Sequence, residues 1–179
     1  MAGCTEVIAL AKHAKYIWPV LVPVGPVISN GAIVYPTEDR AVYGFLASEP
    51  HRLWAVEEGG SRLNQSHRYN PSRLLTTYPF PDAIDVVREP GEQLAAAMDA
   101  ARDQLGLGIT DLLNQVHAAA EPPVEVAAVR RAIAAVDRAV LVAHGFAIDT
   151  EHALRSDGTR TWFGLDATVT ALLRARLLG

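Results

Sequence analysis

Residues 51–81 read HRLWAVEEGGSRLNQSHRYNPSRLLTTYPFP, and the rest of the chain is organised around this stretch. It holds four arginines and two histidines against two acids, together with Asn, Gln and Ser. Side chains of these types read base edges and hold phosphates in protein–DNA complexes. The alternative interpretation is a polar surface loop beside a hydrophobic core, because local patterns of this kind often arise without a function.

Short apolar runs between residues 6 and 35, including one at 16–17, predict strands in the part that precedes this stretch. Asn30-Gly31 predicts a hairpin turn, and the prolines at 19, 23 and 26 predict edge strands or bends. The chain begins almost inside the first run, as we expect of a segment that enters the middle of a fold.

Apolar spacing changes to a helical period after residue 37. It predicts helices at 38–48 and 50–58, the second ended by Gly59-Gly60. Residues 61–69 are expected to be extended or looped. Pro71 and the prolines at 79 and 81 predict a non-helical exit.

Helical patterns then dominate residues 91–145. Gly106 is expected to end a first helix, Thr110 to cap a second, and Gly145 to follow the third. A short apolar piece at 162–163 precedes a last helix from about Asp166. The side chains predicted inside the three helices are Leu94, Met98, Leu105, Leu113, Val116, Val129, Ile133, Val136 and Val140. The sequence therefore predicts an α+β fold, with a small bent β-rich module at 1–81 and a helical module at 91–179.

Composition limits the class of protein. The 179 residues carry a net charge of −4 and a pI near 5.8, which does not indicate a nucleic-acid partner by itself. Residues 1–81 hold seven Lys and Arg against six Asp and Glu, whereas 82–179 hold nine against fourteen. The N-terminal part is therefore the better candidate for binding a polyanion. A single cysteine, Cys4, and the lack of a signal-peptide or membrane-spanning pattern favour the cytoplasm.

Three patterns in order give the chain a resemblance to a known family. The first, W-A-x(n)-G-S-x-L-x(n)-R-Y-x(n)-Y/F-P-F-P, runs through residues 54–81. The second, G-L-x(4)-N-x(2)-H, lies at 108–117 with Ile109 in place of Leu. The third, L/V-D-x-A-V-L-x-A-Y-G-W, lies at 136–146, where His144 and Phe146 replace Tyr and Trp. Together they resemble the C-terminal target-recognition region of MmeI-like restriction–modification enzymes and related adenine-N6 DNA methyltransferases.

The resemblance implies a part of such an enzyme without its catalytic centre. The sequence has no glycine-rich turn for S-adenosylmethionine and no N-P-P-Y/F tetrapeptide, since Asn70-Pro71-Ser72-Arg73 departs from it. We therefore predict no catalytic residue, no bound cofactor and no metal, with S-adenosylmethionine held by a separate domain. His117 is expected to be a buried, hydrogen-bonded histidine, Trp54 a core residue, and Asp137 with Arg138 a solvated or inter-helix pair.

The predicted function is sequence-specific recognition of double-stranded DNA for a restriction–modification or phage-defence methyltransferase. A methyltransferase or endonuclease chain would be a second partner, and no membrane is involved. Arg62 and Arg68 suit guanine or phosphate, and Asn64 and Gln65 suit adenine edges. The full set of predicted DNA contacts is Arg52, Ser61, Arg62, Asn64, Gln65, Ser66, His67, Arg68, Tyr69 and Arg73. Two alternatives stay open: a detached structural remnant without activity, and a small hydrolase that uses His67 with Glu57 or Glu58.

Overall fold

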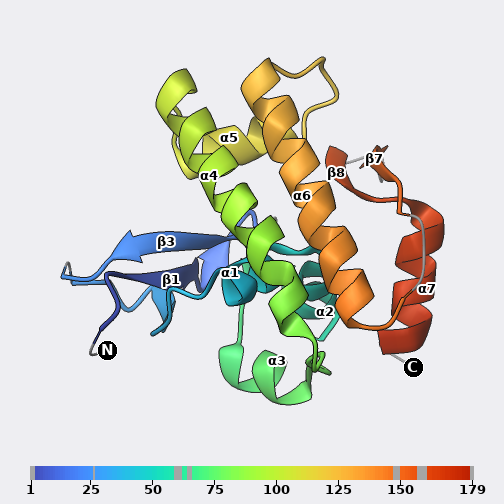
Figure 1. The fold of residues 1–179 in the computed structure, drawn as a ribbon, viewed down its shortest axis with the longest axis horizontal. Coiled ribbons are helices and arrows are strands. Elements are labelled where there is room, and N and C mark those ends of the chain that lie inside the picture. The colour runs from blue at the N-terminus through green and yellow to red at the C-terminus, as the bar shows by residue number, and fades with distance from the viewer. Residues whose placement is uncertain are drawn as a thin grey trace.

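The structure is a computed structural model that describes residues 3–25, 27–58, 62–63, 66–146, 150–156 and 161–177. It confirms the α+β class. Two long helices, α4 (Arg88–Leu105) and α6 (Val124–Ala143), run side by side through the middle (Figure 1). A twisted antiparallel sheet lies on one side of them, and a β-hairpin with the C-terminal helix lies on the other (Figure 1).

The N-terminal sheet has the order β3-β1-β4, with β1 (Glu6–Ala11) between β3 (Pro19–Pro23) and β4 (Ala32–Tyr35). Pro19 and Pro23 lie on the edge strand, as predicted, where a missing N–H interrupts no inner ladder. The predicted Asn30-Gly31 hairpin is wrong, because β3 and β4 both pair with β1. Residues 16–17 are also not a strand, although Ile17 is buried.

Helices α1 (Arg40–Ala47) and α2 (Glu49–Glu58) confirm the two helices predicted before the glycine pair. The Asp39 side chain begins α1 by accepting a hydrogen bond of 2.7 Å from the Ala41 N–H. The predicted non-helical exit at Pro71 is wrong: Pro71 begins helix α3 (Pro71–Thr77). Asn70 caps that helix, and proline is well suited to the first helical position, where its missing N–H would have had no partner.

The helical part follows the predicted spacing closely. After the short turn η1 (Ile84–Val87) come α4, α5 (Ile109–Val116) and α6. Gly106 and Gly145 have positive φ at the ends of α4 and α6, as predicted. The cap of α5 was misplaced, since Gly108 and not Thr110 precedes it. All the side chains predicted inside are buried except Leu105, which is half-buried.

The C-terminal segment contains one element that the sequence did not predict. Strand β7 (His152–Ser156) pairs antiparallel with β8 (Thr161–Leu165), which includes the predicted apolar piece. Helix α7 (Ala167–Leu177) follows, and the Asp166 side chain accepts hydrogen bonds from the N–H groups of Thr168 and Val169. Within the described residues, no helix combines the length and apolar character needed to cross a membrane.

A single large hydrophobic cluster joins residues from both predicted modules, including Ile8, Phe45, Leu94 and Val136. A smaller cluster, with Leu53 of α2 and Leu141 of α6, seats α7 through Val169 and Leu173. The division at residues 81 and 91 therefore remains a prediction about function and is not marked by separate cores.

Ile133→Ala should lower the free energy of unfolding by about 2–3 kcal/mol, in the lower part of the range for a buried isoleucine. The lower part is expected because 6% of Ile133 is exposed, whereas Val129 and Val140 on the same helix are fully buried. Urea denaturation monitored by circular dichroism measures the change. A loss below about 0.5 kcal/mol would be typical of an exposed site and would contradict the packing of α6.

Candidate nucleic-acid interface

A second small sheet carries the predicted DNA-reading stretch. Its order is β2-β6-β5, with β2 (His13–Ala14), β5 (Arg62–Leu63) and β6 (Ser66–Arg68). All pairings are antiparallel, and His13 lies directly opposite Arg68. The Tyr69 N–H extends the ladder by donating to the Lys12 carbonyl at 3.0 Å. The segment after β1 is thereby fixed beside the predicted recognition stretch.

Two of the predicted contacts are exposed in the described structure. Arg68 lies on β6, and Arg73 lies in the first turn of α3. Arg73 is 56% exposed, and its Nη2 lies 3.6 Å from Glu58 Oε2. An exposed pair at that distance contributes little stability. Both arginines are therefore available to a partner.

Six of the predicted contacts cannot be placed as side chains. Ser61, Asn64 and Gln65 lie outside the described residues, and so do the side chains of Arg62, Ser66 and His67. Their roles stay predictions. The described backbone shows that β5 pairs antiparallel with β6.

Arg52 and Tyr69, also predicted as contacts, face other protein groups. The Arg52 guanidinium donates to the Glu49 carboxylate, with Nε–Oε2 at 2.6 Å. Tyr69 is 2% exposed, and its hydroxyl lies 3.1 Å from the Tyr35 hydroxyl and 2.9 Å from His51 Nε2. Tyr69 therefore holds the predicted recognition stretch to the core, and its ring is buried instead of exposed. The sequence alone could not show which members of a mixed stretch face inward.

His51 is a structural histidine. Its Nδ1 lies 2.8 Å from the Leu46 carbonyl, so Nδ1–H donates and Nε2 accepts from the Tyr69 hydroxyl. Burial lowers the pKa of His51 to about 4. His117 is held similarly: its Nδ1 accepts from the Phe163 N–H at 3.0 Å, and burial with nearby Arg52 lowers its pKa to about 4. His117 is hydrogen-bonded, as predicted, but it is half-buried and not fully buried.

Acid should destabilise the protein through these two histidines. Each has a folded-state pKa below the ordinary histidine pKa of 6.5, so its contribution to stability is complete above pH 6.5 and is lost as the pH falls toward 4. Unfolding near pH 5 should therefore take up about one proton per histidine. Urea unfolding measured from pH 7 to 4 gives the slope of the free energy of unfolding against pH. In His51→Gln the slope should fall by about one proton, and an unchanged slope would contradict the assignment.

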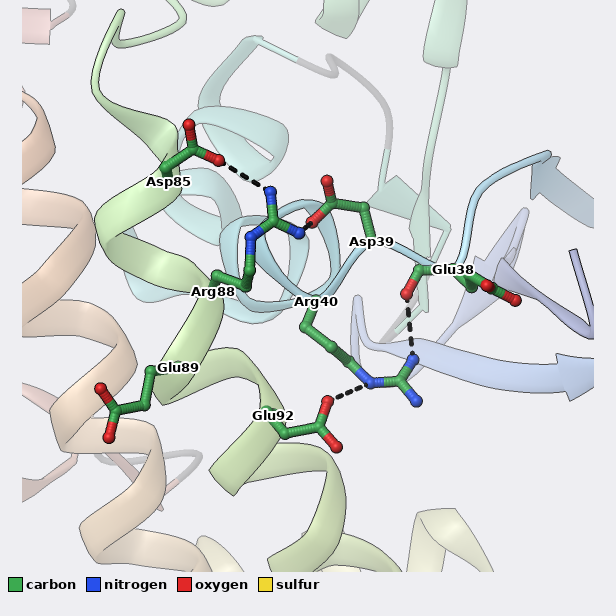
Figure 2. Close-up of a pocket in the computed structure, with 7 residues that line it drawn as sticks. All are labelled: Glu38, Asp39, Arg40, Asp85, Arg88, Glu89 and Glu92. Carbon is green, nitrogen blue, oxygen red and sulfur yellow. Dashed lines mark hydrogen bonds and ion pairs between the residues drawn. The ribbon is translucent and has the colours of Figure 1, made fainter.

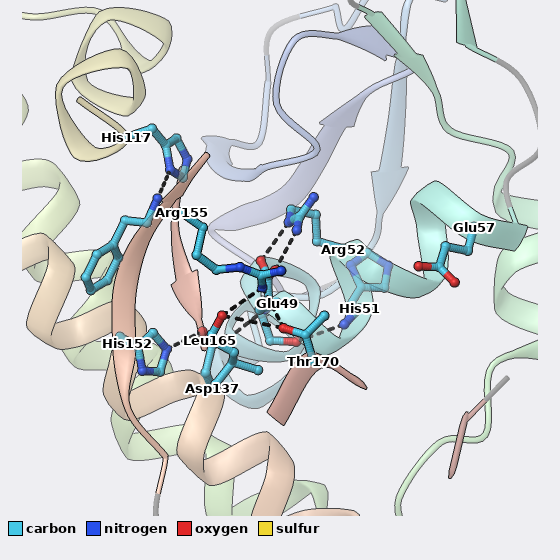
Figure 3. Close-up of polar contacts among 12 residues, drawn as sticks. Glu49, His51, Arg52, Glu57, His117, Asp137, His152, Arg155, Leu165 and Thr170 are labelled. Atoms are coloured by element: carbon cyan, nitrogen blue, oxygen red, sulfur yellow. Dashed lines mark hydrogen bonds and ion pairs between the residues drawn. The ribbon is translucent and has the colours of Figure 1, made fainter. Parts of the chain in front are cut away.

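A buried polar network joins α2, α6 and the C-terminal hairpin (Figure 3). Asp137 is fully buried; its Oδ1 accepts from the Glu49 N–H at 2.7 Å, and its Oδ2 lies 2.8 Å from His152 Nε2. Arg155 donates to the Leu165 carbonyl and to Thr170 Oγ1. Burial raises the pKa of Asp137, and the hydrogen bond with His152 opposes that rise.

This network corrects one prediction from the sequence. Asp137 is not half of a solvated pair with Arg138, because Asp137 is buried and Arg138 is exposed. The available signal was spacing, since Asp137 lies on the same helix face as Ile133 and Val140. Trp54 is in the core, as predicted, with 8% of its surface exposed.

An open polar pocket lies between the start of α1 and the first turns of α4 (Figure 2). Its two arginines are already engaged: Arg40 with Glu6 and Glu92, and Arg88 with Asp39 and Asp85. The pocket therefore consists mainly of satisfied ion pairs, and it suits a structural junction better than an anion site.

The described residues contain no group of three or more His, Cys, Asp or Glu side chains suited to a metal ion. The two acids proposed for a hydrolase are both ion-paired, Glu57 with Arg174 and Glu58 with Arg73. The His67 side chain lies outside what the structure describes. The described residues therefore give no support to a hydrolase site made of His67 with Glu57 or Glu58.

Comparison with known proteins adds one finding. No family model and no curated protein match the chain. A solved structure of the type IIL restriction–modification enzyme MmeI in complex with DNA is similar to it, with a TM-score of 0.62 and 20% sequence identity. The likeness covers 83% of this chain and 20% of that chain. The protein therefore has a fold related to a part of that enzyme and spans about a fifth of its length.

Proposed function

We propose that this protein reads DNA sequence as the target-recognition part of a restriction–modification or phage-defence methyltransferase system in the cytoplasm. The observation that carries the proposal is the fold it shares with a part of a restriction–modification enzyme. The three sequence patterns, met in order, support it independently. The exposed Arg68 and Arg73, on and just after the paired strands β5 and β6, supply side chains of the required chemistry.

In this proposal the hairpin of β5 and β6 enters the major groove. Asn64 and Gln65, which lie between the two strands in the sequence, would contact adenine edges, and Arg62 and Arg68 would contact guanine or phosphate. Arg73, with Ser61 and Ser66, would bind phosphates. Tyr69 and His51 hold the base of the hairpin through their buried hydrogen bond. S-adenosylmethionine and the reacting groups would belong to a separate catalytic domain or chain.

Selection from a pool of randomised duplexes should recover a preferred site. On that site, Arg62→Ala or Asn64→Ala should cost about 1–3 kcal/mol of binding free energy, with little change on other sequences. Arg73→Ala should weaken binding about equally on all duplexes, because phosphates carry no sequence information. Fluorescence anisotropy with the purified chain, with and without a catalytic partner, measures both effects.

The two alternatives give different results in the same assay. A structural remnant would bind no duplex and would show no preferred site even with the partner restored. A hydrolase would lose turnover on His67→Ala without any change in DNA affinity. Micromolar binding of S-adenosylmethionine by the purified chain, measured by calorimetry, would also contradict the assignment of catalysis to a separate domain.

A further inference from the structure

The segment that enters β2 is basic, and it lies outside the stretch that the sequence singled out. Residues 12–16 read KHAKY, and neither they nor residues 62–70 contain an Asp or Glu. Pairing of β2 with β6 places His13 opposite Arg68. Residues directly opposite in an antiparallel pair share a face and lie within about 5.5 Å at their Cα atoms. Two segments far apart in the sequence thus lie side by side, and neither of them contains an acid.

The charges on this surface are not neutralised by acids. Lys12 Nζ donates to Asn30 Oδ1 at 2.9 Å, and Lys15 Nζ donates to Asn114 Oδ1 at 2.7 Å. Both acceptors are neutral amides, which hold the ammonium groups without removing their charge. Elsewhere Arg40, Arg88 and Arg174 are bound to carboxylates. In the part of the chain that the structure describes, Lys12, Lys15 and Arg68 have no ion pair.

We infer that Lys12 and Lys15, with His13 beside Arg68, form a second row of DNA contacts that binds the phosphate backbone next to the groove entered by the β5–β6 hairpin. The inference rests on the proposed function and extends it to residues outside 51–81. Phosphate is the expected ligand because an ammonium group on a flexible stem acts as a point charge and does not present the fork that reads guanine. Asn30 and Asn114 anchor the two lysines, and displacing a neutral amide leaves no buried acid unpaired.

The double variant Lys12→Ala/Lys15→Ala tests the inference on a duplex of about 30 base pairs. Its affinity should fall about tenfold on preferred and unrelated duplexes alike. The slope of log affinity against log salt should become shallower by about two, one for each lost phosphate contact. Lys12→Arg/Lys15→Arg should keep the parent's slope, since the charges remain.

Two matched controls separate this effect from net charge and from folding. Arg131→Ala/Arg138→Ala also removes two positive charges, but from exposed positions of α6. It should leave the salt slope of DNA binding unchanged. Asn114→Ala removes the hydrogen bonds of Lys15 and Tyr16 but keeps the lysine charge, so it should keep the slope as well.

The outcomes distinguish the two proposals. If the parent binds duplex DNA and the lysine double variant keeps its affinity and salt slope, the second row of contacts is refuted and the proposed function stands. An equal loss in the α6 double variant would also refute it, because the effect would then come from net charge. If the parent binds no duplex with the catalytic partner present, the proposed function itself fails and the inference fails with it.

Discussion

Asp137→Ala should lower the free energy of unfolding by about 3–5 kcal/mol, because each of the two buried groups that it leaves without an acceptor costs about 1–3 kcal/mol. Both carboxylate oxygens are in use, one for the Glu49 N–H and one for His152 Nε2. Alanine would leave both groups buried without an acceptor. Among the described residues, His152 Nδ1 has no hydrogen-bond partner, so none of them offers a second acceptor in its place.

Two further substitutions sharpen this test. Asp137→Asn keeps an oxygen for the Glu49 N–H and offers an N–H₂ to His152 Nε2, which accepts in the other neutral tautomer. We therefore expect it to cost about 1–2 kcal/mol, clearly less than alanine. Arg138→Ala, at the neighbouring exposed position, should stay within about 0.5 kcal/mol. Equal losses for Ala and Asn at position 137 would show that the polar contacts do not support the fold.

The helical half of the fold could be predicted because its signal is local. Leu94, Met98 and Ala101 recur at helical spacing and are all buried, and the glycines at the ends of α4 and α6 adopt the positive φ that favours glycine. Strand β7 gave no such signal, because its side chains are half-buried or exposed and do not alternate. The prediction at Pro71 was wrong for a different reason. Proline breaks the interior of a helix, but it is well suited to the first turn, where Pro71 lies.

The candidate site was predictable in its location but not in its members. Residues 51–81 contain the exposed Arg68 and Arg73, yet the same stretch contains Tyr69, Arg52 and His51, whose polar atoms bind other protein groups. Local composition does not distinguish the exposed residues from the inward-facing ones, because tertiary packing decides which side chains face the core. The basic segment before residue 16 could not be attached to the site at all from sequence. Only the pairing of β2 with β6 brings it there.

Gly91→Ala should cost about 3 kcal/mol or more, at or above the usual upper limit for overpacking a core. Helices α1 and α4 cross at Gly44 and Gly91. A Cβ at Gly91 would lie 2.0 Å from the Arg40 carbonyl oxygen and 3.3 Å from the Gly44 nitrogen. These are backbone atoms and cannot rotate away, so the two helices would have to separate. The same shift would disturb the ion pair of Arg40 with Glu92 across the crossing.

Thermal unfolding provides the measurement, with an expected fall in Tm of roughly 6–12 °C for a domain of this size. Gly108→Ala is the matched control, because its Cβ would meet no atom within 4 Å and its φ is −70°. We expect that control to stay within about 1 kcal/mol of the parent, since alanine is a poorer helix cap than glycine but fits the backbone. A Gly91→Ala protein as stable as the control would mean that α1 and α4 do not approach as closely as described. The core beneath the proposed recognition surface would then have to be packed differently.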